Sequence, residues 1–177
     1  MKSNRLTFQS VLNHSELVSP SIFSLAQKMN NSEIMVAEID PAYMGGKELC
    51  EYYGVDPSEG ANCVIVEAVY VDRSEKAAVI VPVGYRADLN GLVKKYLGAK
   101  KVSLANLEIV LGETGMEYGS ITPFGLPESY KILVDSRLME KEKIVVGGGK
   151  QISKLLLPTS VFQMIGAEII ENLSNPL

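Results

Sequence analysis

The sequence is poor in the side chains on which most hydrolases depend. Its 177 residues include one histidine, His14, and two cysteines, Cys50 and Cys63. A zinc site takes three or four Cys, His or carboxylate ligands, and a catalytic triad needs a histidine base, whereas His14 lies in a polar N-terminal stretch. The composition therefore argues against a self-contained zinc site and against Ser-His-Asp or Cys-His catalysis. We expect no metal and no cofactor.

Long apolar runs and a strong excess of one charge are also missing. No apolar run approaches the roughly 20 residues of a membrane helix, and residues 2–10 are not followed by the apolar stretch of a secretory signal. We therefore expect a cytoplasmic protein with no membrane partner and with two free thiols. Lys and Arg number 17 against 21 Asp and Glu, a net charge of -4. This balance disfavours DNA as a partner, so any RNA contact must come from a local basic patch.

What the sequence does contain is typical of one globular domain. Hydrophobic residues make up 46% and charged residues 21%, no repeat is present, and 177 residues is an ordinary length for a single core. We expect a main domain over residues 32–177, and an N-terminal helical extension over 1–31 that packs on it. Within the extension, Ile22, Leu25, Ala26 and Met29 have helical spacing.

The strand signals point to a mixed sheet. Residues 62–71 and 77–83 are rich in Val and Ile and are separated by Asp72-Arg73-Ser74, which predicts a hairpin, and the second run is apolar enough for a central strand. Further strands are expected at 34–39, 101–104, 130–134, 143–146 and 154–157, with an edge strand at 167–170. Helices are expected at 47–53, after Asp88, from Asn106 to a stop at Gly112, and after Thr159. The predicted class is α+β, with a strongly curved, partly barrel-like mixed sheet and short helices around it.

Two glycine-rich loops are the main candidates for a binding site. They are TGMEYGSITPFGLP (residues 114–127) and the run Gly147–Gly149. Glycine has no Cβ, so such loops let backbone amides approach a ligand, although they can equally be tight turns between strands. Neither is a phosphate-binding P-loop or a dinucleotide fingerprint, which argues against a nucleotide hydrolase.

Four segments together resemble one known family. They are GVDPSEGANCVIVEA (54–68), VPVGYRADLNGLVKKYLGAKKVSLA (81–105), TGMEYGSITPFGLP (114–127) and IVVGGGKQISKLLLP (144–158). Their order and spacing resemble the YbaK/EbsC family of freestanding aminoacyl-tRNA deacylases, also found as an editing domain inserted in bacterial prolyl-tRNA synthetases. The resemblance implies a YbaK-like fold for residues 32–177. It also implies hydrolysis of the ester that joins a wrong, small amino acid to tRNA.

The resemblance also implies a set of site residues. Residues 119–123 match the GxxxP loop that shapes the aminoacyl pocket, and 147–149 match the glycine turn beside it. The substrate-binding residues implied in this way are Gly119, Ser120, Ile121, Thr122, Pro123, Gly125, Gly147, Gly148, Gly149 and Ser153. Ser153 stands where some members have aspartate.

Position 62 is the main departure from the family. Better-known members have lysine followed by threonine where this chain has Asn62-Cys63, a change that resembles an asparagine-bearing branch of the superfamily. Asn62 is the candidate catalytic residue, orienting the ester or a water, although it can also be a plain strand residue. By strand alternation Cys63 is expected in the core, and Asp135 is expected at a solvated strand end.

Two lysine groups are the candidate tRNA contacts, unless they are ordinary solvated surface. One comprises Lys94, Lys95, Lys100 and Lys101, and the other Lys150 and Lys154. The leading hypothesis is a trans-editing hydrolase acting on misacylated tRNA, in which a positioned water attacks and the amides of residues 119–122 stabilise the oxyanion. One alternative is a non-catalytic module of the same fold that binds aminoacyl-tRNA or a nucleotide-like ligand. Another is a subunit that docks on a synthetase through residues 22–29. The sequence sets no expectation for an oligomer.

Overall fold

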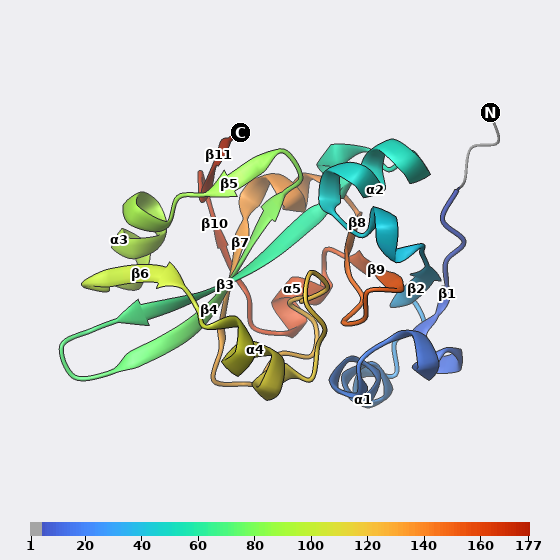
Figure 1. The fold of residues 1–177 in the computed structure, drawn as a ribbon, viewed down its shortest axis with the longest axis horizontal. Helices are drawn as coiled ribbons and strands as arrows, with labels where there is room; N and C mark the ends of the chain where they lie inside the picture. Colours follow the sequence, from blue (N-terminus) through green and yellow to red (C-terminus); the bar gives the residue numbers. More distant parts are fainter. Residues whose placement is uncertain (1–4) are drawn as a thin grey trace.

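The computed structural model describes residues 5–177 and contains a five-stranded mixed sheet as its largest element (Figure 1). The order is β10–β7–β4–β3–β6, in which β4 is antiparallel to β3 and parallel to β7. The strands span Ala61–Val69 (β3), Ser74–Pro82 (β4), Lys101–Leu104 (β6), Lys131–Asp135 (β7) and Glu168–Ile170 (β10). The predicted hairpin, the central position of its second strand and the edge strand near the C-terminus are all confirmed.

A second sheet has four strands. Its order is β1–β2–β9–β8, and all neighbours are antiparallel. The strands span Gln9–Ser10 (β1), Met35–Glu38 (β2), Lys143–Gly147 (β8) and Ser153–Pro158 (β9). A parallel bridge between Gly60 and Val145 joins this sheet to the start of β3. A small pair, β5 (Tyr85–Ala87) with β11 (Ser174–Pro176), completes the α+β fold, in which the sheets do not close into a barrel.

The helices are short and lie around the sheets (Figure 1). They are α1 (Pro20–Met29), α2 (Gly46–Tyr53), α3 (Lys94–Leu97), α4 (Leu107–Thr114) and α5 (Val161–Met164), with a π-helical turn at Leu89–Val93 before α3. Single 3-10 turns occur at Val11–Asn13, Ser15–Leu17, Pro41–Tyr43, Pro57–Glu59 and Ser136–Glu140.

Two predicted helix boundaries were wrong. Helix α4 continues through Gly112 and ends at Thr114, followed by Gly115 as the C-cap with φ +65°. A glycine inside a helix costs only about 1 kcal/mol, so Gly112 does not end the helix, whereas the left-handed backbone of the C-cap favours glycine. The last helix is flanked by Ser160, because the Thr159 hydroxyl instead donates to the carbonyl of Lys141. The short strands β1, β5 and β11 were not predicted.

The N-terminal segment is part of the main core. Ile22 and Ala26 of α1 are fully buried, and Val11 and Val18 pack in the same cluster as residues of β4, β7, β8 and β9. The apolar face of α1 is therefore used inside the molecule. Docking on a synthetase through residues 22–29 stays a prediction, and only the exposed face of α1 is open to it. Residues 1–4 of the expected extension lie outside the described residues.

Asp135 is the clearest correction to the expected surface. It is 0% exposed instead of solvated, because β11 and residue Asn172 cover the end of β7. Its carboxylate forms an ion pair with Arg137 at 2.9 Å and accepts a hydrogen bond from the Ser174 hydroxyl at 2.6 Å. Among residues 5–177, no helix combines the length and apolarity needed to cross a membrane.

Candidate functional site

A cavity of about 410 Å³ lies where the two sheets meet. Its walls come from the start of β3, the end of β8, the start of β9, one side of α4, and residues 44–46 before and at the start of α2. Residues Tyr118, Gly119 and Ile121 of the first glycine-rich loop form another wall. Most of the lining is apolar, so a polar group at this place stands out.

Asn62 and Cys63 both line this cavity from β3. Asn62 is exposed and lies against α2, since a Cβ on Gly46 would be only 2.8 Å from Asn62 Oδ1. Cys63 packs against the core, as strand alternation predicts, but it also reaches the cavity wall. Burial raises the pKa of the Cys63 thiol to about 12. The thiol is therefore protonated near neutral pH and is not a ready nucleophile.

The first glycine-rich loop offers two free amides at the cavity. Gly119 and Ile121 line it, and their N–H groups make no hydrogen bond to any of residues 5–177. The N–H of Ser120 instead donates to the carbonyl of Glu117 at 3.1 Å, so it is not available as an oxyanion donor. The expectation that all amides from Gly119 to Thr122 form an oxyanion hole is thus corrected for Ser120.

The two glycine-rich loops are hydrogen-bonded to each other. The N–H of Gly149 donates to the carbonyl of Ser120 at 2.9 Å, and the N–H of Glu117 donates to the carbonyl of Gly149 at 2.8 Å. Gly147 allows the close approach, because a Cβ there would be 2.6 Å from the Ser120 carbonyl oxygen. The glycines serve contact between the loops, which fixes the wall that carries Gly119 and Ile121.

Most of the other expected substrate residues do not line the cavity. Of the implied set, Gly119, Ile121 and Gly147 do so, whereas Ser120, Thr122, Pro123, Gly125, Gly148, Gly149 and Ser153 do not. Ser120 and Thr122 are buried, whereas Ile121 between them is half-buried and lines the cavity. Gly125 lies against the backbone of Ile22 in α1, and the hydroxyl of Ser153 donates to the carbonyl of Leu17. These residues hold the loops onto the N-terminal segment.

Lys154 is the residue whose position the sequence reasoning missed. It was expected in an exposed pair with Lys150, but it is 6% exposed and lines the cavity, opposite Gly147 in the β8–β9 pair. Lys150 donates to the carbonyl of Glu16 at 2.7 Å, so the exposed pair does not form. The available signal was a lysine within an apolar strand, KLLLP, directly after the glycine-rich turn. Burial lowers the pKa of Lys154 to about 8.

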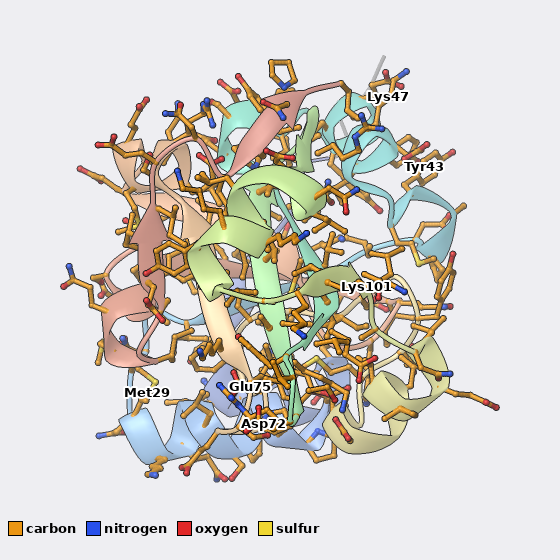
Figure 2. The ribbon with its side chains drawn as sticks, turned by 90° about the vertical axis from the view of Figure 1, so that its left-hand side faces the viewer. Met29, Tyr43, Lys47, Asp72, Glu75 and Lys101 are labelled. Atoms are coloured by element: carbon orange, nitrogen blue, oxygen red, sulfur yellow. The ribbon has the colours of Figure 1, made fainter. Side chains whose placement is uncertain are left out.

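The other lysine group does lie on one surface. Lys95, Lys100 and Lys101 are exposed and Lys94 is half-buried. Figure 2 shows Lys101 on the side that faces the viewer, which is the end of the molecule that carries β6 and α3 in Figure 1 and not the end that carries α2. A second hollow of about 760 Å³, lined by Arg86 and Asn90 among others, shares three residues with the cavity: Asn62, Val64 and Leu104. This hollow therefore adjoins the cavity on one side, and on the other it reaches the turn at Leu89–Val93 that leads into α3.

The fold and the cavity define a class before any relative is considered. An apolar pocket with free loop amides, one amide side chain and one ammonium group has the composition of a small-molecule binding site. In the part of the chain that the structure describes, no three His, Cys, Asp or Glu side chains gather as metal ligands.

Comparison with known proteins gives the family. Residues 40–164 match the model of the aminoacyl-tRNA editing domain, and the chain belongs to this family. The chain is 30% identical over 105 residues, 59% of its length, to a proline–tRNA ligase of Nautilia profundicola, of which it covers 18%.

Two solved structures share the fold. The hypothetical protein APE2540 is 23% identical with a TM-score of 0.76, over 88% of this chain and 99% of the other. A protein assigned provisionally as a trans-editing enzyme for prolyl-tRNA synthetase is 18% identical with a TM-score of 0.73, over 87% and 97%. The YbaK-like fold expected from the sequence is confirmed.

Proposed function

We propose that this protein is a trans-editing deacylase, which hydrolyses the ester between a wrong amino acid and the 3' end of a tRNA. The observation that carries the proposal is the cavity itself, which lies within the part of the chain that matches the editing-domain family. The cavity has room for an aminoacyl group, and its apolar walls suit a small side chain. The reaction places the protein in the cytoplasm, where tRNA is charged.

The side chains around the cavity suit a reaction that needs little acid–base equipment. An aminoacyl ester is reactive already, so holding it beside a water and stabilising the developing oxyanion supplies much of the catalysis. The free amides of Gly119 and Ile121 are the proposed oxyanion donors. Asn62, at the cavity rim, carries one acceptor and two donor positions and is proposed to orient the ester or the water.

Systems that charge tRNA with proline supply the first substrates to try. The relative with 30% identity is a proline–tRNA ligase, and one structural neighbour is assigned to editing for prolyl-tRNA synthetase. We therefore propose tRNA specific for proline, carrying a small wrong amino acid, as the leading substrate. The proposed role of a synthetase is to be the source of the misacylated tRNA.

The experiment is a deacylation screen of the whole chain with a panel of mischarged tRNAs. The proposal predicts multiple turnovers on at least one member and much slower release with Ala105→Phe, which places a ring at the cavity wall. Val71→Phe is the matched control, because Val71 is 80% exposed beyond the end of β3 distant from Asn62. Saturable binding that protects the ester, without turnover, would instead support a non-catalytic binding module.

Lys94, Lys95, Lys100 and Lys101 are proposed to contact the phosphates of the acceptor stem, since they lie past the second hollow from the cavity. Changing all four to Gln should weaken tRNA binding and make it less sensitive to salt, because each lost phosphate contact reduces counterion release. Binding measured from low to moderate salt tests this. An unchanged slope of log affinity against log salt would place the tRNA elsewhere on the protein.

A further inference from the structure

Lys154 is the only buried lysine or arginine among residues 5–177. It extends from β9 into the cavity and makes no ion pair or hydrogen bond with any of these residues. A buried ammonium without a partner is costly, because it gives up its hydration and gains no opposite charge. Its position therefore suggests a partner that arrives with the ligand.

The surroundings of Lys154 leave it free for such a ligand. The groups that titrate near it are the thiols of Cys50 on α2 and Cys63 on β3 and the phenol of Tyr118 on the glycine-rich loop. None of these is a carboxylate, and burial raises the pKa of both thiols, which keeps the thiols protonated at neutral pH. The other walls provide the neutral amide of Asn62 and the free amides of Gly119 and Ile121. Lys154 is therefore the one full positive charge in the cavity.

We propose that the Lys154 ammonium donates a hydrogen bond to the carbonyl oxygen of the ester and stabilises the negative charge that develops there. This role rests on the proposed deacylase function and adds a catalytic residue to it. The oxygen of a water adds to the carbonyl carbon and the carbonyl electron pair moves to the oxygen beside Lys154. That pair then returns as the bond to the ribose oxygen breaks, and the proton of the water ends on the ribose oxygen. The products are a free amino acid and tRNA with its 3' end intact.

The proposal gives the reaction a characteristic dependence on pH. Lys154 acts as a donor only while it is protonated, and its pKa of about 8 means that this form is lost above pH 8. The advantage of the wild type over a variant without the ammonium should therefore shrink from pH 7 to pH 9. An arginine at position 154 stays charged from pH 7 to pH 9, so the advantage of Lys154→Arg over a variant without a positive charge should be the same at both pH values.

The experiment compares kcat and KM of the wild type, Lys154→Met and Lys154→Arg on the best mischarged tRNA, at pH 7 and pH 9. We expect Lys154→Met to lower kcat at pH 7 by about 100-fold, the usual effect of removing one oxyanion donor, with little change in KM. Lys154→Arg should retain a higher kcat than Lys154→Met at both pH 7 and pH 9. The matched control is Lys143→Met, which removes an exposed lysine from the adjacent strand β8 and should leave both constants unchanged.

A double variant, Asn62→Lys with Lys154→Met, moves the charge from β9 to β3 on the rim of the same cavity. Partial recovery of kcat relative to Lys154→Met would support a role for the charge itself. A folded Lys154→Met protein with wild-type kcat, or a loss equal at pH 7 and pH 9, would overturn the role of Lys154 and leave the deacylase proposal standing. A wild-type protein that turns over no member of the panel would overturn the deacylase proposal.

Discussion

Two buried charged residues in this molecule have opposite surroundings. Asp135, at the end of β7, is 0% exposed and has a complete set of partners: Arg137 at 2.9 Å and the Ser174 hydroxyl at 2.6 Å. Lys154, on β9, is almost as deeply buried and has neither an ion pair nor a hydrogen bond within residues 5–177. One charge is satisfied by the fold, while the other faces a cavity.

The difference separates a structural charge from a candidate functional one. Removing one partner of a buried ion pair is strongly destabilising, because the other group loses its compensation. Removing a buried charge that has no partner relieves a cost of desolvation. The two sites should therefore respond to mutation with opposite signs in stability, and only the Lys154 site should respond in activity.

The largest expected effect on stability is at Asp135. Asp135→Ala should lower the free energy of unfolding by about 3 kcal/mol or somewhat more, because it removes the acceptor of two hydrogen bonds to a buried charge, each worth about 1.5 to 3 kcal/mol, while the Arg137 side chain that remains is one-third exposed. Chemical denaturation at pH 7 measures this. A decrease in the free energy of unfolding below about 1 kcal/mol would mean that solvent replaces the carboxylate at little cost. Asp135 would then not be a structural charge in the sense that separates it from Lys154.

The next effect has the opposite sign. Lys154→Met should raise the free energy of unfolding at pH 7 by up to about 3 kcal/mol, since folding lowers the pKa of Lys154 from 10.5 to about 8 and one pKa unit is worth about 1.4 kcal/mol. Between pH 8 and 10.5 the unfolded wild type binds more protons than the folded one, so wild-type stability rises with pH relative to the variant. Measuring unfolding of both proteins at pH 7 and at pH 9.5 tests this prediction. If the difference in free energy of unfolding between Lys154→Met and the wild type is not smaller at pH 9.5, the prediction is contradicted.

The smallest effect tests one hydrogen bond of the satisfied site. Ser174→Ala removes the hydroxyl donor to Asp135 but leaves the ion pair with Arg137 in place. The free energy of unfolding should fall by about 1 to 2 kcal/mol, as for other hydrogen bonds to charged groups. Comparing the thermal unfolding of Ser174→Ala with that of Asp135→Ala shows how much of the stability lost in Asp135→Ala comes from the hydrogen bond of the Ser174 hydroxyl. Equal losses in the two variants would show that the ion pair itself adds nothing.

Much of the fold was predictable because the local signals agree with the tertiary structure. The apolar runs of β3 and β4 and the turn between them predicted the hairpin and the central strand, and four spaced segments predicted the family. The two-residue and three-residue strands β1, β5 and β11 were not predictable, because each is fixed by a distant partner and not by a periodic pattern of its own.

The sequence predicted which segments lie near the site, but not which of their residues line the cavity. The loops and Asn62 were expected near the pocket, and Gly119, Ile121, Gly147 and Asn62 do line it. Which residues face the cavity depends on the direction of the chain at each position, which a loop without periodicity does not encode. Lys154 was assigned to a surface patch because it is charged, whereas its direction is set by its pairing with Gly147 and Ala37 on either side of β9.

That pairing has a consequence for how much of the chain a working unit needs. Residues 40–164 match the editing-domain family, yet Ala37 of β2, the strand hydrogen-bonded to β9 beside Lys154, lies before residue 40. A piece of the chain that began at residue 40 would expose the edge of β9 and would lose α1, against which Gly125 and Gly149 pack. The minimal autonomous domain therefore extends further toward the N-terminus than the family match, at least to the strand that holds β9 in place.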